Sequence, residues 1–171
     1  MSFEPIGVAR TPFATPADTR MRTTRSAGAE GTVELRPELA AGLADLAGFE
    51  RIWVIWHAHL QGPANLIVQP PFQTPPKGVF ATRSPRRPNS IGLSCLRLLA
   101  VEGNVLRVAD VDMVDGTPVL DIKPYSRWSD CWPNARCGWL EDVDRPGDNP
   151  AESSLRKDWD HPEEDEAWKD L

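Results

Sequence analysis

The residues with the clearest chemical potential lie between Arg83 and Ser94, in the stretch RSPRRPNSIGLS. Arg83, Arg86 and Arg87 share this stretch with two prolines. Proline fixes its own φ and restricts the residue before it, so these arginines lose less entropy on binding than they would on a flexible loop. Guanidinium groups bind phosphate or carboxylate through paired hydrogen bonds. The stretch therefore predicts an anion-binding loop with Asn89 as an added polar contact, and a solvated surface loop is the alternative.

A second polar segment, DMVDGTPVLDIKPY, begins at Asp112. Asp112 and Asp115 bracket a turn, and Asp121, Lys123 and Tyr125 then alternate along an expected strand, which places all three on one face. Ionisable groups are costly to bury unless they pair with each other or meet a ligand. The pattern therefore indicates either a ligand site or a structural ion pair between Asp121 and Lys123.

Two histidines, His57 and His59, are two residues apart in an expected strand and project from the same face. They could share a metal ion, but a third ligand at a diagnostic spacing is missing, so we expect no metal site. A polar pocket lining or a hydrogen-bonded core histidine fits the pair better. The sequence also has no GxGxxG, P-loop, GxSxG or HExxH motif, which removes the main evidence for the common nucleotide-binding, hydrolase and zinc enzyme classes.

The formal net charge of −6 is distributed unevenly along the chain. Residues 1–140 hold 15 Lys and Arg against 13 Asp and Glu, a net of +2, whereas residues 141–171 hold 4 against 12, a net of −8. The acidic segment has few aliphatic residues and cannot bury enough surface to fold alone. We therefore expect one domain over residues 1–140 and an acidic tail over 141–171, so that the net charge does not exclude a nucleic-acid partner.

The cellular compartment is predicted from what the sequence lacks. No apolar run approaches the roughly 20 residues of a membrane helix, and the first residues do not have the pattern of a signal peptide. The 3 cysteines have no CxxC spacing, so buried or incidental thiols are expected. We expect a cytoplasmic protein with no membrane partner.

The elements that must position these residues are mostly short strands. ERIWVIWHAHL, residues 50–60, alternates apolar and mixed positions as a central strand does, and residues 94–101 and 105–114 flank a hairpin turn at Glu-Gly-Asn, in which Val101 and Val105 are expected to face each other. Shorter strands are expected at 6–9, 32–35, 65–68, 79–82 and 119–122. One helix is expected over residues 36–48, from the Pro37 start signal to Gly48. The fold class is therefore mostly β, a small β-barrel with one or two short helices.

Four stretches resemble one known family. PIGVARTPF, FERIWVIWHAHL, GVFATRSPRRPNSIGLS and DGTPVLDIKPY together span most of residues 5–125, and they are similar to the TsaA-like or YaeB-like family. Its characterised members are S-adenosylmethionine-dependent methyltransferases of threonylcarbamoyl-adenosine in tRNA. The resemblance implies a small β-barrel that forms a homodimer, S-adenosyl-L-methionine as the cofactor and tRNA as the partner.

The resemblance also implies site residues. Cofactor contacts are expected at Arg20, Met21, Arg22, His59, Leu60, Arg83, Leu93, Asp112, Met113, Val114 and Asp115. Substrate contacts are expected at Arg86, Arg87, Asn89 and Lys123. The acceptor nitrogen must lose a proton, and His59, Asp121 and Tyr125 are the candidates for the general base.

Two other functions stay open at this point. The chain could methylate a different RNA site or a small molecule, or it could be a non-catalytic barrel that only binds S-adenosylmethionine. A pure binding protein would have no need for the ionisable set Asp121, Lys123 and Tyr125, which favours an enzyme. Trp128 and Trp132 follow this set and could stack on an unpaired base or pack at the barrel mouth or the dimer interface.

Overall fold

A computed structural model describes residues 2–19, 28–70 and 74–143 of the chain. Its contacts divide the chain into two compact units, Met1–Trp132 and Pro133–Leu171. The described part of the second unit contains a 3-10 turn, Gly138–Asp142. Within the described residues, no helix is both long enough and apolar enough to cross a membrane.

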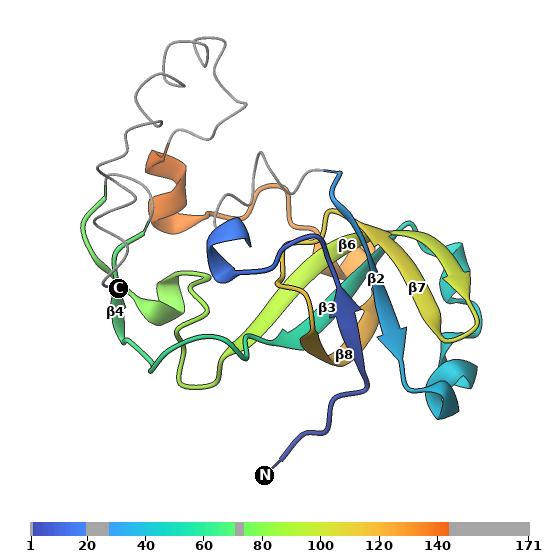
Figure 1. The fold of residues 1–171 in the computed structure, drawn as a ribbon. Coiled ribbons are helices and arrows are strands. Elements are labelled where there is room, and N and C mark those ends of the chain that lie inside the picture. Colours follow the sequence, from blue (N-terminus) through green and yellow to red (C-terminus); the bar gives the residue numbers. More distant parts are fainter. Residues whose placement is uncertain (1, 20–27, 71–73, 144–171) are drawn as a thin grey trace. The chain divides into compact units, whose positions relative to one another are not determined.

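The first unit is built on a closed barrel of six strands (Figure 1). They are β1 (Gly7–Arg10), β2 (Glu30–Leu35), β3 (Arg51–His57), β6 (Ile91–Glu102), β7 (Val105–Ala109) and β8 (Thr117–Pro124). Around the barrel the order is β1-β2-β7-β6-β3-β8, and every neighbouring pair is antiparallel. A separate two-stranded sheet pairs β4 (Ile67–Val68) with β5 (Lys77–Gly78). The mostly β barrel expected from the sequence is confirmed.

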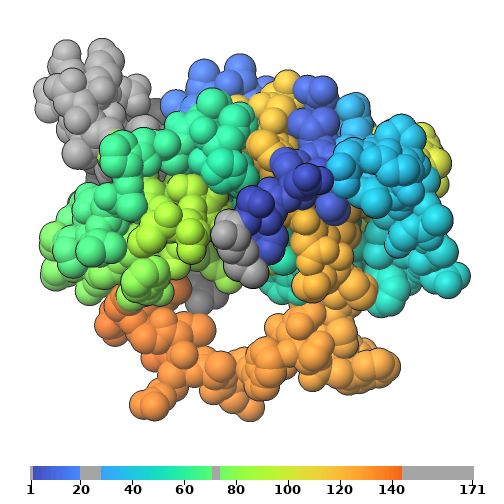
Figure 2. Space-filling model, turned by 90° about the horizontal axis from the view of Figure 1, so that it is seen from below, coloured from blue at the N-terminus to red at the C-terminus, as the bar shows by residue number. Residues whose placement is uncertain are grey.

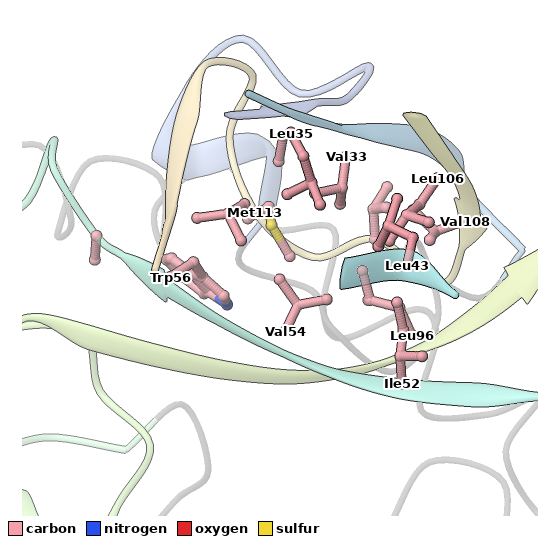
Figure 3. Packing of buried hydrophobic residues seen from close by; sticks show 14 residues of the cluster. Val33, Leu35, Leu43, Ile52, Val54, Trp56, Leu96, Leu106, Val108 and Met113 are labelled. Atoms are coloured by element: carbon pink, nitrogen blue, oxygen red, sulfur yellow. The ribbon is translucent and has the colours of Figure 1, made fainter. Parts of the chain in front are cut away.

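Every second side chain along the strands points inward, and these apolar side chains fill the barrel. Ile52, Val54 and Trp56 of β3 are buried, while the residues between them are half-buried. They meet Leu96 of β6 and Leu106 and Val108 of β7 in one cluster, where the labelled side chains converge (Figure 3). Burial of this apolar surface is the main term that stabilises the closed sheet.

The hairpin between β6 and β7 is tighter than the predicted one. Glu102 pairs with Val105 and Val101 with Leu106, so the loop is the two residues Gly103 and Asn104. Val101 and Val105 therefore do not face each other, and that expectation was wrong. Gly103 has a φ of +63°, which is typical of the first loop position in a type II′ turn, where glycine carries no steric cost.

The predicted helix over residues 36–48 is wrong in type. It is replaced by two 3-10 turns, Pro37–Leu43 and Leu46–Gly48, with Asp45 between them at a φ of +64°. The backbone bonds run from Ala44 N to Ala41 O and from Phe49 N to Leu46 O, the i to i+3 pattern. Leu43 is buried and Leu46 packs against the core partly buried, so two side chains rather than an apolar stripe anchor the segment, and an α-helix gains little from packing.

The strand expected at residues 79–82 is also wrong, because Val79–Ala81 forms a 3-10 turn and β5 ends at Gly78. The remaining short helices are the 3-10 turn Pro16–Thr19 and the α-helix α1, Arg127–Asp130.

Antiparallel pairing brings several connections to one end of the barrel. Because β3 runs antiparallel to β6 and β8, and β7 to β6, the end of β3, the start of β6, the end of β7 and the start of β8 share that end. The connection from β3 to β6 begins and finishes there, and its described residues, 58–70 and 74–90, contribute green parts of the surface in Figure 2. The loop from β7 to β8, residues 110–116, crosses the same end.

Candidate functional site

We call residues 110–116 the aspartate loop, and its best anchored member is Asp112. Ser94 Oγ donates to Asp112 Oδ1 at 2.5 Å and accepts from Trp56 Nε1 at 2.9 Å. Because an indole N–H can only donate, the Ser94 proton must be directed at the carboxylate. Ser94 itself is buried. These hydrogen bonds therefore fix the aspartate loop to the first residues of β6 inside the barrel.

Gly92 makes this chain of hydrogen bonds possible. It pairs with Trp56 across the two strands, and a Cβ at Gly92 would lie 2.1 Å from Trp56 Cε2. The indole therefore lies directly over the glycine backbone, from where its Nε1 reaches Ser94. No larger side chain leaves room for that arrangement.

The other members of the aspartate loop are held by the end of β1. Asp115 Oδ1 accepts from Thr11 N at 3.0 Å, and Asp115 N donates to Phe13 O at 2.7 Å. Met113 O accepts from Thr11 Oγ1 at 2.8 Å. The side chains of Met113 and Val114 are buried, so any ligand contact from these two predicted residues must use their backbone.

Asp110 begins the loop with a φ of +67° and takes part in a small ionic cluster. Its carboxylate accepts from Gly28 N at 2.9 Å and lies 3.4 Å from Arg51 Nη1 and 3.7 Å from Arg97 Nε. These contacts offset the cost of a left-handed conformation in a residue that carries a side chain. They also tie the end of β7 to the outer wall of β3 and β6.

We call residues 83–90 the arginine loop, and its three arginines have different environments. Arg87 Nη1 donates to Thr82 O at 2.9 Å and to Val79 O at 3.1 Å, and its guanidinium lies over the Phe80 ring. Arg87 therefore holds the loop together, while Arg83 is exposed and, among the described residues, has no side-chain hydrogen bond or ion pair.

Arg86 and Asn89 complete the arginine loop. Arg86 is half-buried, and its Nη2 would lie 3.2 Å from a Cβ at Gly62, so its guanidinium packs against the turn after β3. Asn89 is exposed and its carbonyl accepts from Ile91 N. Only Arg83 among the loop's arginines is therefore both exposed and without an internal partner in the described chain.

The end of β3 is joined to the arginine loop by the backbone. Ala58 N donates to Ser90 O at 2.8 Å, and the next two residues, His59 and Leu60, are exposed. The sequence-predicted residues His59, Leu60 and Arg83 thus come from one connection at one barrel end, and the aspartate loop is fastened to the same end through Ser94. Arg20, Met21 and Arg22 lie outside the described residues.

The set Asp121, Lys123 and Tyr125 lies elsewhere, on the outer wall of β8. Lys123 Nζ and Asp121 Oδ2 are 2.7 Å apart, which is the ion pair that the sequence left as an alternative. Tyr125 packs against Trp53 at a ring-centroid distance of 6.0 Å, and burial raises the pKa of its hydroxyl. Its backbone N–H donates to Arg51 O, at the start of β3 and away from His59.

Sequence reasoning missed Ser94, Trp56 and Thr11 as parts of this site. Ser94 and Trp56 were interpreted only as strand residues, although a serine at an inward position of a strand requires a buried partner. Within the described chain, no three His, Cys, Asp or Glu side chains gather where they could hold a metal ion.

The barrel residues are the part of the chain that matches a known family. Residues 8–131 match the family model of the tRNA-methyltransferase O N-terminal domain, which is well over half of the chain. The chain belongs to the tRNA-methyltransferase O family. The resemblance found in the sequence is therefore confirmed.

Proteins similar to this chain come from Pyrococcus abyssi, Mus musculus and Pseudomonas aeruginosa. A probable S-adenosyl-L-methionine-binding protein of Pyrococcus abyssi is 46% identical over 139 residues, covering 81% of this chain and 76% of that protein. The tRNA (adenine(37)-N6)-methyltransferase of Mus musculus is 39% identical over 71% of this chain but only 30% of its own length. The crystal structure of TrmO from Pseudomonas aeruginosa has a TM-score of 0.67 and 34% identity, covering 81% of this chain and 62% of that one.

Proposed function

We propose that this chain uses S-adenosylmethionine to methylate the N6 group of adenosine 37 in tRNA, and that its substrate nucleoside there is threonylcarbamoyl-adenosine. The observation that carries the proposal is the hydrogen bond from Ser94 to Asp112, which fastens the aspartate loop to the strand that leaves the arginine loop. The family and the named functions of its relatives support the reaction class. A cytoplasmic location is part of the same proposal.

The residue types at this barrel end fit the cofactor. The exposed Arg83 guanidinium suits the carboxylate of the methionine part, and Asp112 or Asp115 suits its ammonium group or the ribose hydroxyls. Leu60 and Leu93 are 52% and 41% exposed and offer apolar surface to an adenine ring. When bound, S-adenosylmethionine supplies a methyl group already activated by its sulfonium, so the protein mainly orients the acceptor nitrogen and removes its proton.

We further propose that a second copy of the chain completes this site. Leu93 lies on the outer face of β6, whereas its neighbour Ser94 points inward to Asp112, so the two predicted contacts lie on opposite sides of one strand. Ile91, Leu93 and Leu99, which we call the outer strip, are 43%, 41% and 39% exposed. A partner that covers the outer strip would enclose Leu93.

Light scattering should therefore give a particle of about twice the 19.0 kDa chain mass. Ile91→Asp should shift the particle toward the monomer, because it places a charge in the outer strip. Leu66→Asp is the matched control, since Leu66 is 62% exposed but lies outside the strip. A monomer at all concentrations, or equal effects of both variants, would contradict this assembly.

The proposed reaction is tested by incubating the protein with S-adenosylmethionine and tRNA that carries or lacks threonylcarbamoyl-adenosine at position 37. Nucleoside mass analysis should show one added methyl group on the threonylcarbamoyl nucleoside and none on unmodified adenosine. Methylation of unmodified adenosine, of another nucleoside or of no nucleoside would reject this substrate. Cofactor binding without any transfer would instead favour a non-catalytic binding protein.

Arg83→Ala serves as the variant that links this reaction to the site. Losing one charge-assisted contact costs about 1.5 to 3 kcal/mol, so the Kd for S-adenosylmethionine should rise by roughly 10- to 100-fold in calorimetry. The control is Arg107→Ala, an exposed arginine of β7 that pairs with Glu30 on the barrel wall. An unchanged Kd in Arg83→Ala would remove the arginine loop from the cofactor site.

A further inference from the structure

A second group of polar and aromatic residues lies at the opposite end of β3 from His59. A cavity of about 420 Å³ is lined there by Glu50, Arg51, Tyr125 and Arg127. The 7 residues of β3 place Arg51 about 20 Å from His57, at the usual rise per residue of an antiparallel strand, while Asp110 at the start of the aspartate loop lies 3.4 Å from Arg51 Nη1. The cavity is open to solvent, and nothing in the proposed methyl transfer uses it.

The wall of this cavity is held rigidly by Asp130. Asp130 Oδ2 accepts from Trp53 Nε1 at 3.0 Å and from Ser126 N at 2.9 Å, and these bonds lower the pKa of its carboxyl. Asp130 therefore stays ionised at neutral pH and fastens α1 to the barrel wall at Trp53. Arg127 and Trp128, the first two residues of α1, are therefore held in a fixed position on the barrel wall.

Trp128 is the most exposed large apolar side chain in the described residues, with 86% of its surface accessible. The Arg127 guanidinium lies 5.8 Å from the centroid of its ring. An exposed ring beside an arginine offers a stacking surface and a positive charge together, and proteins that bind single-stranded nucleic acid use this combination. Burying Trp128 against a planar partner would add the apolar contact that it lacks within the described residues.

We propose that Arg51, Tyr125, Arg127 and Trp128, the tryptophan cluster, bind an unpaired nucleotide of the RNA substrate at a distance from the nucleotide that is methylated. This inference rests on the proposed function, because it extends the same RNA across the barrel. A base stacks on Trp128, and its phosphate meets Arg127. The hydroxyl of Tyr125 donates a hydrogen bond in the cavity.

RNA fits the tryptophan cluster better than a protein partner does. Two of the four residues that line the cavity are arginines and one is Glu50; Arg51 is paired with Asp110, whereas Arg127 has no ion pair among the described residues. Lys123, on the strand that leads to Tyr125, is paired with Asp121, so Arg127 is the cation that meets the phosphate. Stacking also requires an open, flat contact rather than a deep apolar groove, and the exposed ring of Trp128 provides one.

The test measures RNA affinity in full-length protein by fluorescence anisotropy, with a labelled RNA hairpin that has the sequence of a tRNA anticodon arm. Trp128→Ala should weaken binding by roughly 5- to 100-fold, the range seen when a base-stacking aromatic is removed. Trp128→Phe keeps an aromatic face and should restore much of the affinity. Phe3→Ala is the matched control, because Phe3 is also an exposed aromatic, at 67%, but lies outside the cluster.

Each outcome separates this inference from the proposed function. Binding of S-adenosylmethionine should be the same in Trp128→Ala as in the wild type. If the wild type methylates tRNA and Trp128→Ala binds the hairpin equally well, the tryptophan cluster has no RNA role while the enzyme stands. If Trp128→Ala instead changes only the particle mass, a protein covers Trp128, and the inference is overturned. If the wild type binds neither RNA nor cofactor, both proposals fail.

Discussion

Replacing Gly92 with alanine should destabilise the barrel by about 3 kcal/mol, at the upper end of the usual cost of overpacking a core. The new Cβ would stand 2.1 Å from Trp56 Cε2, and the indole is buried, so it has no free space into which to move. Any shift of the ring also breaks its bond to Ser94 and leaves a buried N–H without a partner. Thermal unfolding should show a midpoint lower by roughly 6 to 12 °C.

Gly78→Ala is the matched control for this prediction. Gly78 ends β5 with a φ of −60° and a ψ of 137°, and no other atom lies within 4 Å of the point where a Cβ would be added. Alanine should therefore be neutral there, or slightly stabilising because it restricts the unfolded chain. Equal midpoints for Gly92→Ala and Gly78→Ala would mean that the Trp56 indole is not confined as described.

The second large effect concerns the proton of the acceptor nitrogen, and we expect His59→Ala to lower kcat by about 100-fold or more. His59 is the candidate base at the barrel end where β6 leaves the arginine loop and Ser94 fastens the aspartate loop. Tyr125 lies at the other end of β3, and Asp121 is paired with Lys123 on the outer wall. Methylation of tRNA should be measured at saturating S-adenosylmethionine, so that weaker cofactor binding does not lower the rate.

Three further variants serve as comparisons for His59→Ala. Asp121→Asn and Tyr125→Phe should each lower kcat far less than His59→Ala. His57→Ala, an exposed histidine two residues earlier on β3, should leave kcat unchanged. A larger loss in Asp121→Asn would show that the outer wall supplies the base, which requires a second chain to bring that wall to the site.

Much of the barrel could be predicted because its strands alternate. The pattern of Ile52, Val54 and Trp56 selects the inner face of β3, and Glu-Gly-Asn marks the hairpin. The predicted helix over residues 36–48 failed because leucine spacing alone does not show that only Leu43 is buried in the core, with Leu46 partly buried against it. Residues 79–82 failed as a strand because β-branched and aromatic types favour strands only where a neighbouring strand is available.

The site could be predicted in its residue types but not in its connections. The sequence indicates an anion-binding arginine loop, yet it does not reveal that Arg87 donates to the carbonyls of Val79 and Thr82, just before the loop, while Arg83 is exposed. The link from Ser94 to Asp112 spans 18 residues and the link from Trp56 to Ser94 spans 38. Such pairs are set by barrel register, which local spacing does not determine.

Closure of the barrel joins β1 to β8, with Gly7 opposite Val119. During synthesis, β1 can pair with β8 only after more than 100 further residues have been made. Until then β1 and its neighbour β2 expose unpaired backbone. Topologies dominated by such distant pairings fold slowly and are open to aggregation in the interval. On the ribosome this chain completes its barrel only after β8 has emerged, so its yield should depend on protection of the nascent N-terminal strands.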